Sequence, residues 1–279
     1  MLLAALVAAP VLLGMGYALL ASLGLVGAGA EGVPSGQRLA AVLGARSTWR
    51  SLAWTLYVSA SATTLATAGA VGVAIGLPSR GRIGRLTRAL AVLPLPVPHL
   101  VAAATALLLF AQSGLFARLL FSVGLIAEPA AMPALVYDQA GIALIATLAW
   151  KELPFLTVVA LALRTGADPA LDEAARSLGA SPAAVRRHVQ WPMLWRGLLP
   201  AVIAVFVFAL GSFETAVLLA PVDPAPLAVL TMERFADPAL ARRGEAWVLA
   251  LLAFALSALA VVAHEWARAR WSATARRAA

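Results

Sequence analysis

Cysteine is absent from this chain of 279 residues, so neither disulfides nor thiolate metal sites are possible. Histidine occurs only as His99, His188 and His264, which are too far apart to indicate a metal-ligand pair. Lysine occurs only as Lys151, inside an apolar run, whereas a phosphate-binding P-loop needs a lysine after a glycine. The sequence therefore predicts no metal site and no cofactor in this chain, and it excludes ATP binding through a P-loop.

Charged residues make up only 12% of the chain and hydrophobic residues 62%, whereas about half of the residues of an average soluble domain are apolar. Lysine, arginine, aspartate and glutamate are missing altogether from three runs: Met1 to Ala30, Ser51 to Ser79, and Ala89 to Ala117. Each run is longer than the roughly 20 residues that a helix needs to cross the hydrocarbon of a membrane. The sequence therefore predicts a multi-pass membrane protein in contact with membrane lipids.

The formal net charge of +8 would by itself suit a protein that binds nucleic acid. The arginines, however, occur in short clusters beside the apolar runs, and they do not form a basic face interleaved with aromatic residues. Membrane topology explains this distribution better. We therefore expect no nucleic acid partner.

Six apolar segments predict an all-α fold, a polytopic membrane bundle of about six transmembrane helices in a single transmembrane domain over residues 1–279. The predicted spans are Leu2–Leu25, Leu52–Leu77, Ala89–Phe110, Gly141–Leu163, Gly197–Ala220 and Ala246–Ala263. Between the third and the fourth, the apolar stretch from Leu119 to Tyr137 contains Glu128, Pro129 and Pro133. These residues favour a loop or a re-entrant piece, and a seventh span is the alternative.

The orientation of the spans follows from the basic residues, because short loops rich in arginine are retained on the cytoplasmic side. With six spans, one set of loops carries thirteen arginines and the opposite set carries seven. The thirteen are Arg80, Arg82, Arg85, Arg88, Arg164, Arg176, Arg186, Arg187, Arg196, Arg268, Arg270, Arg276 and Arg277. We therefore expect both termini, and the polar loop before the fifth span, in the cytoplasm.

This polar loop, residues 168–192, has the signals of two short helices. Asp168 before Pro169 is typical of a helix start, because aspartate caps free N–H groups and proline is tolerated in the first turn. Gly179 is typical of a helix stop. Ser181 then repeats the cap, and we expect the second helix to run until Pro192 interrupts it.

The first of these helices has an apolar face and a charged face. The apolar residues recur at the i, i+3, i+4, i+7 spacing and are Leu171, Ala174, Ala175 and Leu178. On the other face, the spacing of Asp172 and Arg176 predicts an ion pair. Small residues surrounded by charges suit docking into a groove of another protein. The alternative is an amphipathic hairpin that lies on the lipid surface.

The loop resembles the signature of ABC importer permeases, which reads Glu-Ala-Ala, three residues, Gly, nine residues, an aliphatic residue, one residue, Leu, Pro. The matching residues are Glu173, Ala174, Ala175, Gly179, Val189 and Pro192. Trp191 departs from the usual leucine, while the spacing is fully kept. In these permeases the motif contacts a separate ATPase subunit, as the resemblance implies, and we expect Asp172 and Leu178, which lie within or beside the motif, to share that contact.

The resemblance implies the type I ABC importer permease fold in a bacterial inner membrane, with residues 168–192 as a cytoplasmic coupling loop. It implies a separate ABC ATPase subunit, which binds ATP and Mg and receives the loop in a cleft. It also implies a second permease subunit, the same or a related chain, and a periplasmic or lipid-anchored substrate-binding protein. The chain itself would then be a permease and not an enzyme.

Ionisable residues inside the spans are candidates for the solute pathway, because a charge at the membrane centre costs about 2.5–3.5 kcal/mol on insertion scales. Lys151 and Glu152 lie about 20 Å from the cytoplasmic end of the fourth span, and Glu214 about 26 Å along the fifth. Ser212 and Phe213 add a hydroxyl and an aromatic face next to Glu214. The alternatives are a structural ion pair for Lys151 and Glu152, and the outer interface for Glu214.

Three segments, "WKELPF", "GSFETAVLLAP" and "ERFADPALARRGEA", resemble the spermidine/putrescine, thiamine and ferric-ion branch of these permeases. Together with the two acidic residues at depth, Glu152 and Glu214, one of which is offset by Lys151, this favours a cationic solute, first a polyamine and then thiamine. The competing functions are a secondary transporter and a membrane-embedded enzyme. The former would more often show repeated halves, and the latter a convergent catalytic set.

Overall fold

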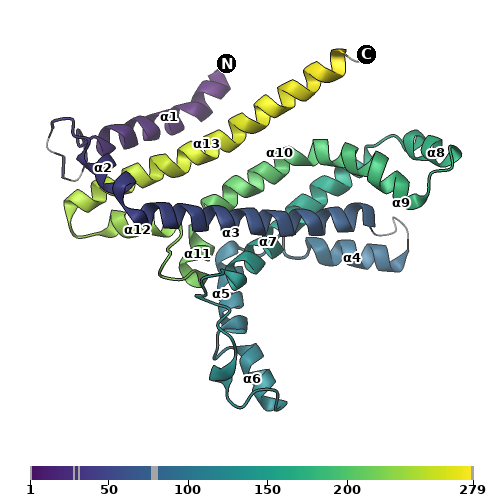
Figure 1. Ribbon diagram of the computed structural model, residues 1–279, viewed down its shortest axis with the longest axis horizontal. Helices are drawn as coiled ribbons and strands as arrows, with labels where there is room; N and C mark the ends of the chain where they lie inside the picture. Colours follow the sequence, from purple (N-terminus) through teal and green to yellow (C-terminus); the bar gives the residue numbers. More distant parts are fainter. Residues whose placement is uncertain (1, 28, 31, 77–80, 278–279) are drawn as a thin grey trace. The chain divides into compact units, whose positions relative to one another are not determined.

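The computed structural model describes residues 2–27, 29–30, 32–76 and 81–277. These residues form helices and turns without a strand (Figure 1), which confirms the predicted all-α fold. Two predictions fall outside the described residues: Leu77 as the end of the second span, and Arg80 as one of the cytoplasmic arginines.

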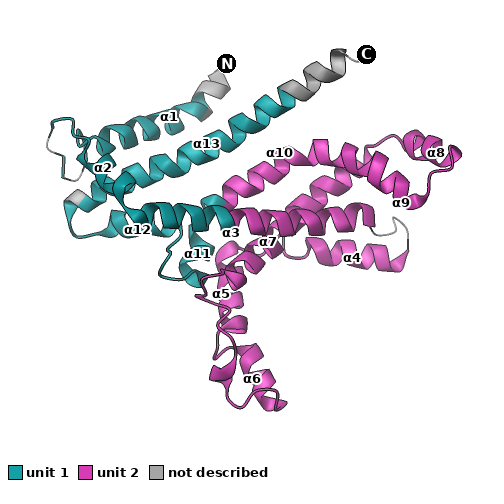
Figure 2. Ribbon diagram, viewed as in Figure 1, with its two compact units in different colours: residues 1–57, 210–279 teal, residues 58–209 magenta. Residues whose placement is uncertain are grey.

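The chain divides into two compact units, shown in different colours in Figure 2. Unit 1 comprises residues 1–57 and 210–279, and unit 2 comprises residues 58–209. Helices α3 (Arg46–Val71) and α10 (Trp191–Leu210) carry the chain from one unit to the other. The single domain over residues 1–279 stays a prediction.

Unit 1 is built around its longest helix, α13. Helix α13 spans Leu240–Arg277. The other helices of unit 1 are α1 (Leu2–Ser22), α2 (Gln37–Gly44), the first part of α3, α11 (Phe213–Leu219) and α12 (Leu227–Ala236). Helices α1, α2 and α12 all contact α13. Buried Val42, Leu227 and Leu249 belong to the apolar core of this unit. The N–H of Leu227 donates to Oγ1 of Thr55 at 2.8 Å and so fixes the start of α12 against α3.

Unit 2 holds the rest of α3 and a series of shorter elements. They are a π-helical turn (Gly72–Gly76), α4 (Arg82–Val92), α5 (His99–Phe110), α6 (Leu115–Ser122), a 3-10 turn (Pro129–Ala131), α7 (Ile142–Thr165), α8 (Pro169–Ser177), α9 (Pro182–Val185), a π-helical turn (Arg186–Gln190) and most of α10. Alanines and leucines of α3, α7 and α10 form its core.

Glycine lets the helices of this core approach closely. A Cβ atom on Gly69 of α3 would lie 2.5 Å from Cδ1 of Leu153 in α7. A Cβ atom on Gly197 of α10 would lie 2.7 Å from Cδ2 of Leu163, also in α7. Both distances are well inside van der Waals contact, so a side chain at either glycine would have to displace the leucine of α7 that packs against it.

Five described segments are long and apolar enough to cross a membrane: Arg46–Gly76, His99–Ser122, Ile142–Thr165, Pro182–Leu210 and Arg242–Ala269. A shorter apolar helix, Ala8–Ser22, lies within α1. These segments correspond to the six predicted spans, and the polytopic membrane bundle is confirmed. Three of the predicted spans nevertheless have the wrong limits.

The predicted third span, Ala89–Phe110, is wrong as one continuous helix. Helix α4 ends at Val92 and α5 begins at His99, and between them Pro94, Pro96 and Pro98 remove the N–H groups that a continuous helix needs. The membrane-crossing segment instead starts at α5 and includes α6, which ends at Ser122. The predicted loop from Leu119 therefore begins inside a helix.

The fifth and sixth spans also differ from the prediction. Helix α10 ends at Leu210, and a new helix, α11, begins at Phe213 after a bend at Gly211 and Ser212. The depth of Glu214 calculated for an unbroken helix therefore does not apply. Helix α13 extends beyond both limits of the predicted sixth span.

Candidate functional site

The Asp168–Pro192 loop has the helix ends that its sequence predicts. Oδ1 of Asp168 accepts from the N–H of Ala170 at 2.9 Å, and Oγ of Ser181 accepts from the N–H of Ala184 at 3.2 Å. Gly179 has a φ of +84°, in the left-handed region that favours glycine. The N–H of Ala180 donates to the carbonyl of Ala175 at 3.0 Å, which completes a Schellman motif at the end of α8.

Helix α8 turns its apolar residues outwards. Leu178 is 89% exposed, and Leu171 and Ala174 on the same face are also exposed. The side chain of Glu173 is exposed as well. No residue of α8 is buried. Within the part of the chain that the structure describes, the apolar face of α8 is therefore left open to another surface.

The predicted interruption at Pro192 is wrong. The helix that begins at Pro182 passes through the π-helical turn Arg186–Gln190 and continues as α10 from Trp191. The changed hydrogen-bond register of the π-helical turn puts Pro192 in the first turn of α10, where the missing N–H is tolerated. Trp191, which departs from the signature, stacks on Trp195 with ring centroids 5.5 Å apart.

Asp172 does not pair with Arg176 among the described residues. Its Oδ2 accepts instead from Nε2 of Gln190, while Oε1 of the same glutamine accepts from Nη1 of Arg164 at 3.1 Å. Arg164 lies in the last turn of α7 and Asp172 in the first turn of α8. One glutamine thus joins the end of a membrane-spanning helix to the loop.

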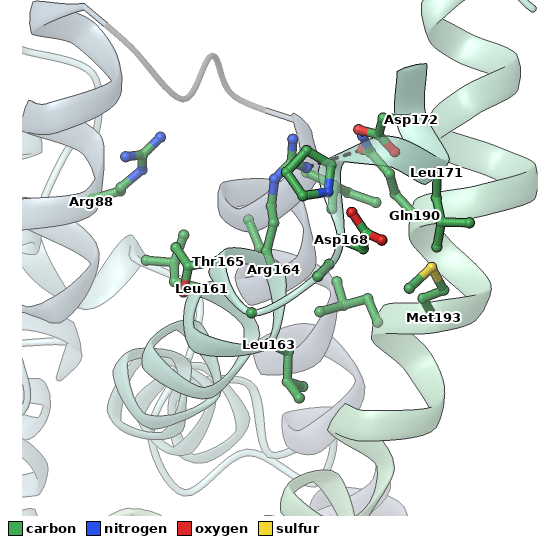
Figure 3. A pocket seen from close by; sticks show the side chains of 16 residues that line it. Arg88, Leu161, Leu163, Arg164, Thr165, Asp168, Leu171, Asp172, Gln190 and Met193 are labelled. Carbon is green, nitrogen blue, oxygen red and sulfur yellow. Dashed lines mark hydrogen bonds between the residues drawn. The ribbon is translucent and has the colours of Figure 1, made fainter. Parts of the chain in front are cut away.

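These residues border a cavity of 770 Å³ within unit 2 (Figure 3). Its polar side is lined by Arg88, Arg164, Asp168, Asp172 and Gln190, and its apolar side by leucines of α7 and by Met193. The cavity lies against the base of the Asp168–Pro192 loop. Helix α8 therefore borders open space and not a packed core.

Lys151 is buried in α7 and forms hydrogen bonds with the bend between α4 and α5. Its Nζ donates to the carbonyl oxygen of Pro94 at 2.9 Å and to that of Val97 at 2.5 Å. Pro98 has no N–H to donate to the carbonyl of Pro94, as a helix would require, and this carbonyl accepts instead from the N–H of Val97 at 3.1 Å and from Lys151. The ammonium group thus adds hydrogen bonds to backbone acceptors at a break between two helices, where backbone groups in a membrane need partners.

Glu152, the next residue, is also buried and lies 3.0 Å from His99, measured from Oε1 to Nε2. His99 is the first residue of α5, and its ring lies 4.9 Å from that of Phe208 in α10. Lys151 and Glu152 thus hold both sides of the bend through separate contacts. Their role in a solute pathway stays a prediction.

The other predicted pathway residues lie in unit 1, at the start of α11. Ser212 precedes the helix, and Phe213 and Glu214 occupy its first turn. The side chain of Glu214 is exposed, and a carboxylate in the first turn interacts favourably with the helix dipole. Phe213 lines a pocket of 250 Å³ with Phe235 and Trp247, among others. Their role in the pathway also stays a prediction.

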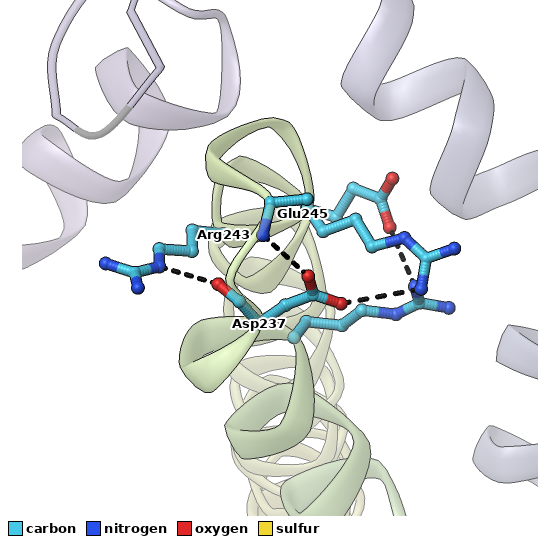
Figure 4. A network of polar contacts seen from close by, with 6 residues as sticks. Asp237, Arg243 and Glu245 are labelled. Atoms are coloured by element: carbon cyan, nitrogen blue, oxygen red, sulfur yellow. Dashed lines mark hydrogen bonds and ion pairs between the residues drawn. The ribbon is translucent and has the colours of Figure 1, made fainter.

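The turn between α12 and α13, residues 234–245, carries a closed network of charges (Figure 4). The carboxylate of Asp237 accepts from the N–H of Ala239 at 2.8 Å and lies 3.4 Å from Nη1 of Arg242. The backbone carbonyl of Asp237 accepts from Nε of Arg243 at 2.8 Å. Nη1 of Arg234 lies 3.5 Å from Oε2 of Glu245.

Three residues of these sites could not be predicted from the sequence. His99 was too isolated in sequence to suggest a contact, and Arg164 and Gln190 gave no signal because their partners are 26 and 18 residues away. The bend that Lys151 holds had a signal in the run "PLPVP", in which alternate residues are prolines.

No family model matches the chain. Two curated relatives, each named molybdenum transport system permease protein ModB, come from Mycobacterium bovis and Mycobacterium tuberculosis. Each is 32% identical over 180 residues, which is 63% of this chain and 63% of the relative. The chain thus matches less than two thirds of the length of these relatives.

Two solved structures share the fold. One is a bacterial ABC transporter involved in the import of the acidic polysaccharide alginate, with a TM-score of 0.72, 16% identity, and coverage of 96% of this chain and 95% of that chain. The other is a bacterial alginate ABC transporter in complex with an alginate pentasaccharide-bound periplasmic protein, with a TM-score of 0.67, 17% identity, and coverage of 90% and 84%. At these identities the likeness shows the fold alone.

The relatives are permease proteins by name, and the shared fold is that of chains from ABC transporters, so the comparisons agree with a multi-pass membrane protein. They do not support the spermidine/putrescine, thiamine and ferric-ion branch, nor a polyamine or thiamine as the solute.

Proposed function

We propose that this chain is the permease subunit of an ATP-driven importer, and that a separate ATPase docks on the Asp168–Pro192 loop. The observation that carries the proposal is the open apolar face of α8, held between a capped start and a Schellman stop. A helix that is held this firmly and yet buries none of its own residues is suited to a partner. The match of the loop to the permease signature supports the same assignment.

The partners follow from this assignment. This chain offers no lysine for a P-loop, because its only lysine, Lys151, is buried in α7 and donates to two carbonyls. ATP and Mg are therefore bound by the separate ATPase. A second permease subunit completes the pathway, and a substrate-binding protein delivers the solute. The bound periplasmic protein in one of the structures with this fold supports that last partner.

The solute is proposed to be an anion, with molybdate as the first candidate. The curated relatives are named for molybdenum, which dissolves in water as an oxyanion, and the solved structures concern an acidic polysaccharide. The contacts of unit 2 agree with this, because the buried carboxylate of Glu152 already has His99 as its partner. It is therefore a poor site for a cation.

The test is to purify the complex from its host through a tag on this chain, identify its subunits by mass spectrometry, and measure ATP hydrolysis with molybdate and its binding protein. We expect an ABC ATPase in the complex and hydrolysis stimulated by molybdate. A chain that takes up molybdate in vesicles without any ATPase would be a secondary transporter. Stimulation by a polyamine and not by an oxyanion would reverse the choice of solute.

A further inference from the structure

The loop and two membrane-spanning helices meet at a single side chain, that of Gln190. Gln190 is the last residue of the π-helical turn before α10, and its amide contacts Arg164 at the end of α7 and Asp172 in α8. All three side chains are partly buried at the edge of the cavity. Figure 3 shows Arg164, Gln190 and Asp172 beside one another.

The orientation of the amide is fixed by the chemistry of its partners. A guanidinium group only donates hydrogen bonds, so it must face the oxygen of the glutamine. A carboxylate only accepts, so it must face the nitrogen. Arg164 and Asp172 are oppositely charged, but no ion pair or hydrogen bond within the described part of the chain joins them directly. The neutral amide is therefore the link between the two charges.

Helix α8 is joined to α7 by residues 166–168 and contacts the π-helical turn. The helix contains no buried residue, and its base borders the cavity of 770 Å³. Packing transmits a displacement only between surfaces that are in contact. A movement imposed on α8 would therefore reach α7 through the connecting residues 166–168 and through the side chains of Asp172, Gln190 and Arg164. It would reach α10 through the turn that carries Gln190. π-helical turns are often found at functional sites, which agrees with this assignment.

We propose that Gln190 is a positioning residue that ties α8 to α7 and α10, so that movement of the docked loop is passed to the membrane-spanning helices. This proposal rests on the proposed function, because it presumes an ATPase that moves α8. The step that links docking to transport then depends on Gln190, a residue outside the matched signature positions.

The first test is Gln190→Leu, which keeps the approximate size of the side chain and removes both hydrogen bonds. In the complex purified from the host, we expect ATP hydrolysis to continue while molybdate uptake per ATP falls about tenfold, since two hydrogen bonds to charged groups are lost. The matched control is Gln112→Leu. Nε2 of Gln112 donates to the carbonyl of Met132 at 2.9 Å, far along the chain from the loop, so this variant should leave the ratio unchanged.

The second test restores the two hydrogen bonds at residue 190 with different chemical groups. Gln190→Glu keeps an acceptor for Arg164 but places a carboxylate against Asp172, so we expect uncoupling. Adding Asp172→Asn to Gln190→Glu provides an amide that donates to the new carboxylate, and coupling should return to at least half of the wild-type ratio. A variant that had merely misfolded would gain nothing from the second substitution.

The third test needs no ATPase and therefore separates this proposal from the proposed function. Amide hydrogen exchange of the full chain in lipid nanodiscs should become about tenfold faster over Pro169–Ser177 in Gln190→Leu, and should return in the double variant. Unchanged exchange in Gln190→Leu, or a wild-type ratio of molybdate uptake to ATP hydrolysis, would overturn the proposed role of Gln190 even if the chain is a permease. If the wild-type complex contains no ATPase, the proposed function fails while the exchange result still decides whether Gln190 holds α8.

Discussion

The Asp168–Pro192 loop and the α12–α13 turn are both short polar connections, yet they use their charges in opposite ways. In the turn, Asp237 contacts Ala239, Arg242 and Arg243, and Glu245 pairs with Arg234. In the loop, the side chains of Glu173, Arg176, Arg186 and Arg187 are exposed, and no hydrogen bond or ion pair of theirs is seen within the described part of the chain. The turn stabilises itself, whereas the loop presents its groups outwards.

The exposure of an apolar side chain in the loop adds to this difference between the two connections. Leu178 in the loop is 89% exposed, although leucine is among the residues most often buried. Its backbone is nonetheless fixed by the Schellman motif at Gly179. An exposed apolar side chain on a well-defined backbone is typical of a binding surface, while a closed charge network is typical of a structural turn. Substitutions in the loop should therefore change coupling, and substitutions in the turn should change stability.

The largest effect is expected from Glu173→Lys. The substitution reverses an exposed charge at the first residue of the matched signature, so it should repel the surface that receives the loop. We expect molybdate uptake by the purified complex to fall at least about tenfold, equivalent to about 1.4 kcal/mol, with unchanged thermal stability of the chain. Normal uptake together with normal ATPase binding would remove Glu173 from the interface.

Gly179→Leu is expected to have the next largest effect. The left-handed φ of +84° costs a residue with a side chain roughly 1–2 kcal/mol, although a Cβ atom would meet nothing within 4 Å. The end of α8 should therefore shift, and molybdate uptake per ATP hydrolysed should fall about fivefold. Gly179→Asn is the matched control, because asparagine tolerates this conformation and should retain most of the coupling. Equal losses in both variants would exclude the backbone as the cause.

Glu245→Gln probes the opposite region. It removes one charge from the pair with Arg234, whose side chains are only about a quarter exposed, so we expect a loss of about 0.5–1 kcal/mol in stability. The midpoint of thermal unfolding should fall by a few degrees, while uptake per ATP stays at the wild-type value. A change in that ratio without a change in stability would show that the turn shares the function of the loop.

Arg242→Ala should have the smallest effect. Its side chain is 58% exposed and lies 3.4 Å from Asp237, which retains the N–H of Ala239 when the guanidinium is lost. Exposed pairs of this kind contribute about 0–1 kcal/mol. We expect no measurable change in uptake and at most a slight fall in the unfolding midpoint. A large fall would mean that the network acts as one unit.

The features that could be predicted from the sequence are those that depend on residues close together in the chain. Asp168, Gly179 and Ser181 fix helix ends through contacts within a few residues, and all three do so in the structure. The apolar face of α8 likewise follows from spacing alone. The membrane-spanning segments were found because their length is set by the thickness of the bilayer, which acts on every span in the same way.

The features that could not be predicted from the sequence depend on distant partners or on competing local effects. Lys151 has its acceptors 57 and 54 residues away, and no pattern in the sequence joins them. The break before α5 does not follow from apolar composition, which continues through it, but from three prolines within the apolar run. Pro192 was expected to end a helix because the preceding π-helical turn, which changes the hydrogen-bond register, has no simple sequence signal.

The most direct test of docking compares two single-cysteine variants, because the natural chain contains no cysteine. Leu178→Cys and Val222→Cys replace side chains that are 89% and 90% exposed, one in the loop and one in unit 1 after α11. Each variant complex is treated with a short crosslinker that joins a thiol to an amine, and the products are identified by mass spectrometry. We predict that Leu178→Cys crosslinks to the ATPase and that Val222→Cys does not. Equal labelling of both cysteines, with no ATPase attached through Leu178→Cys, would contradict the account.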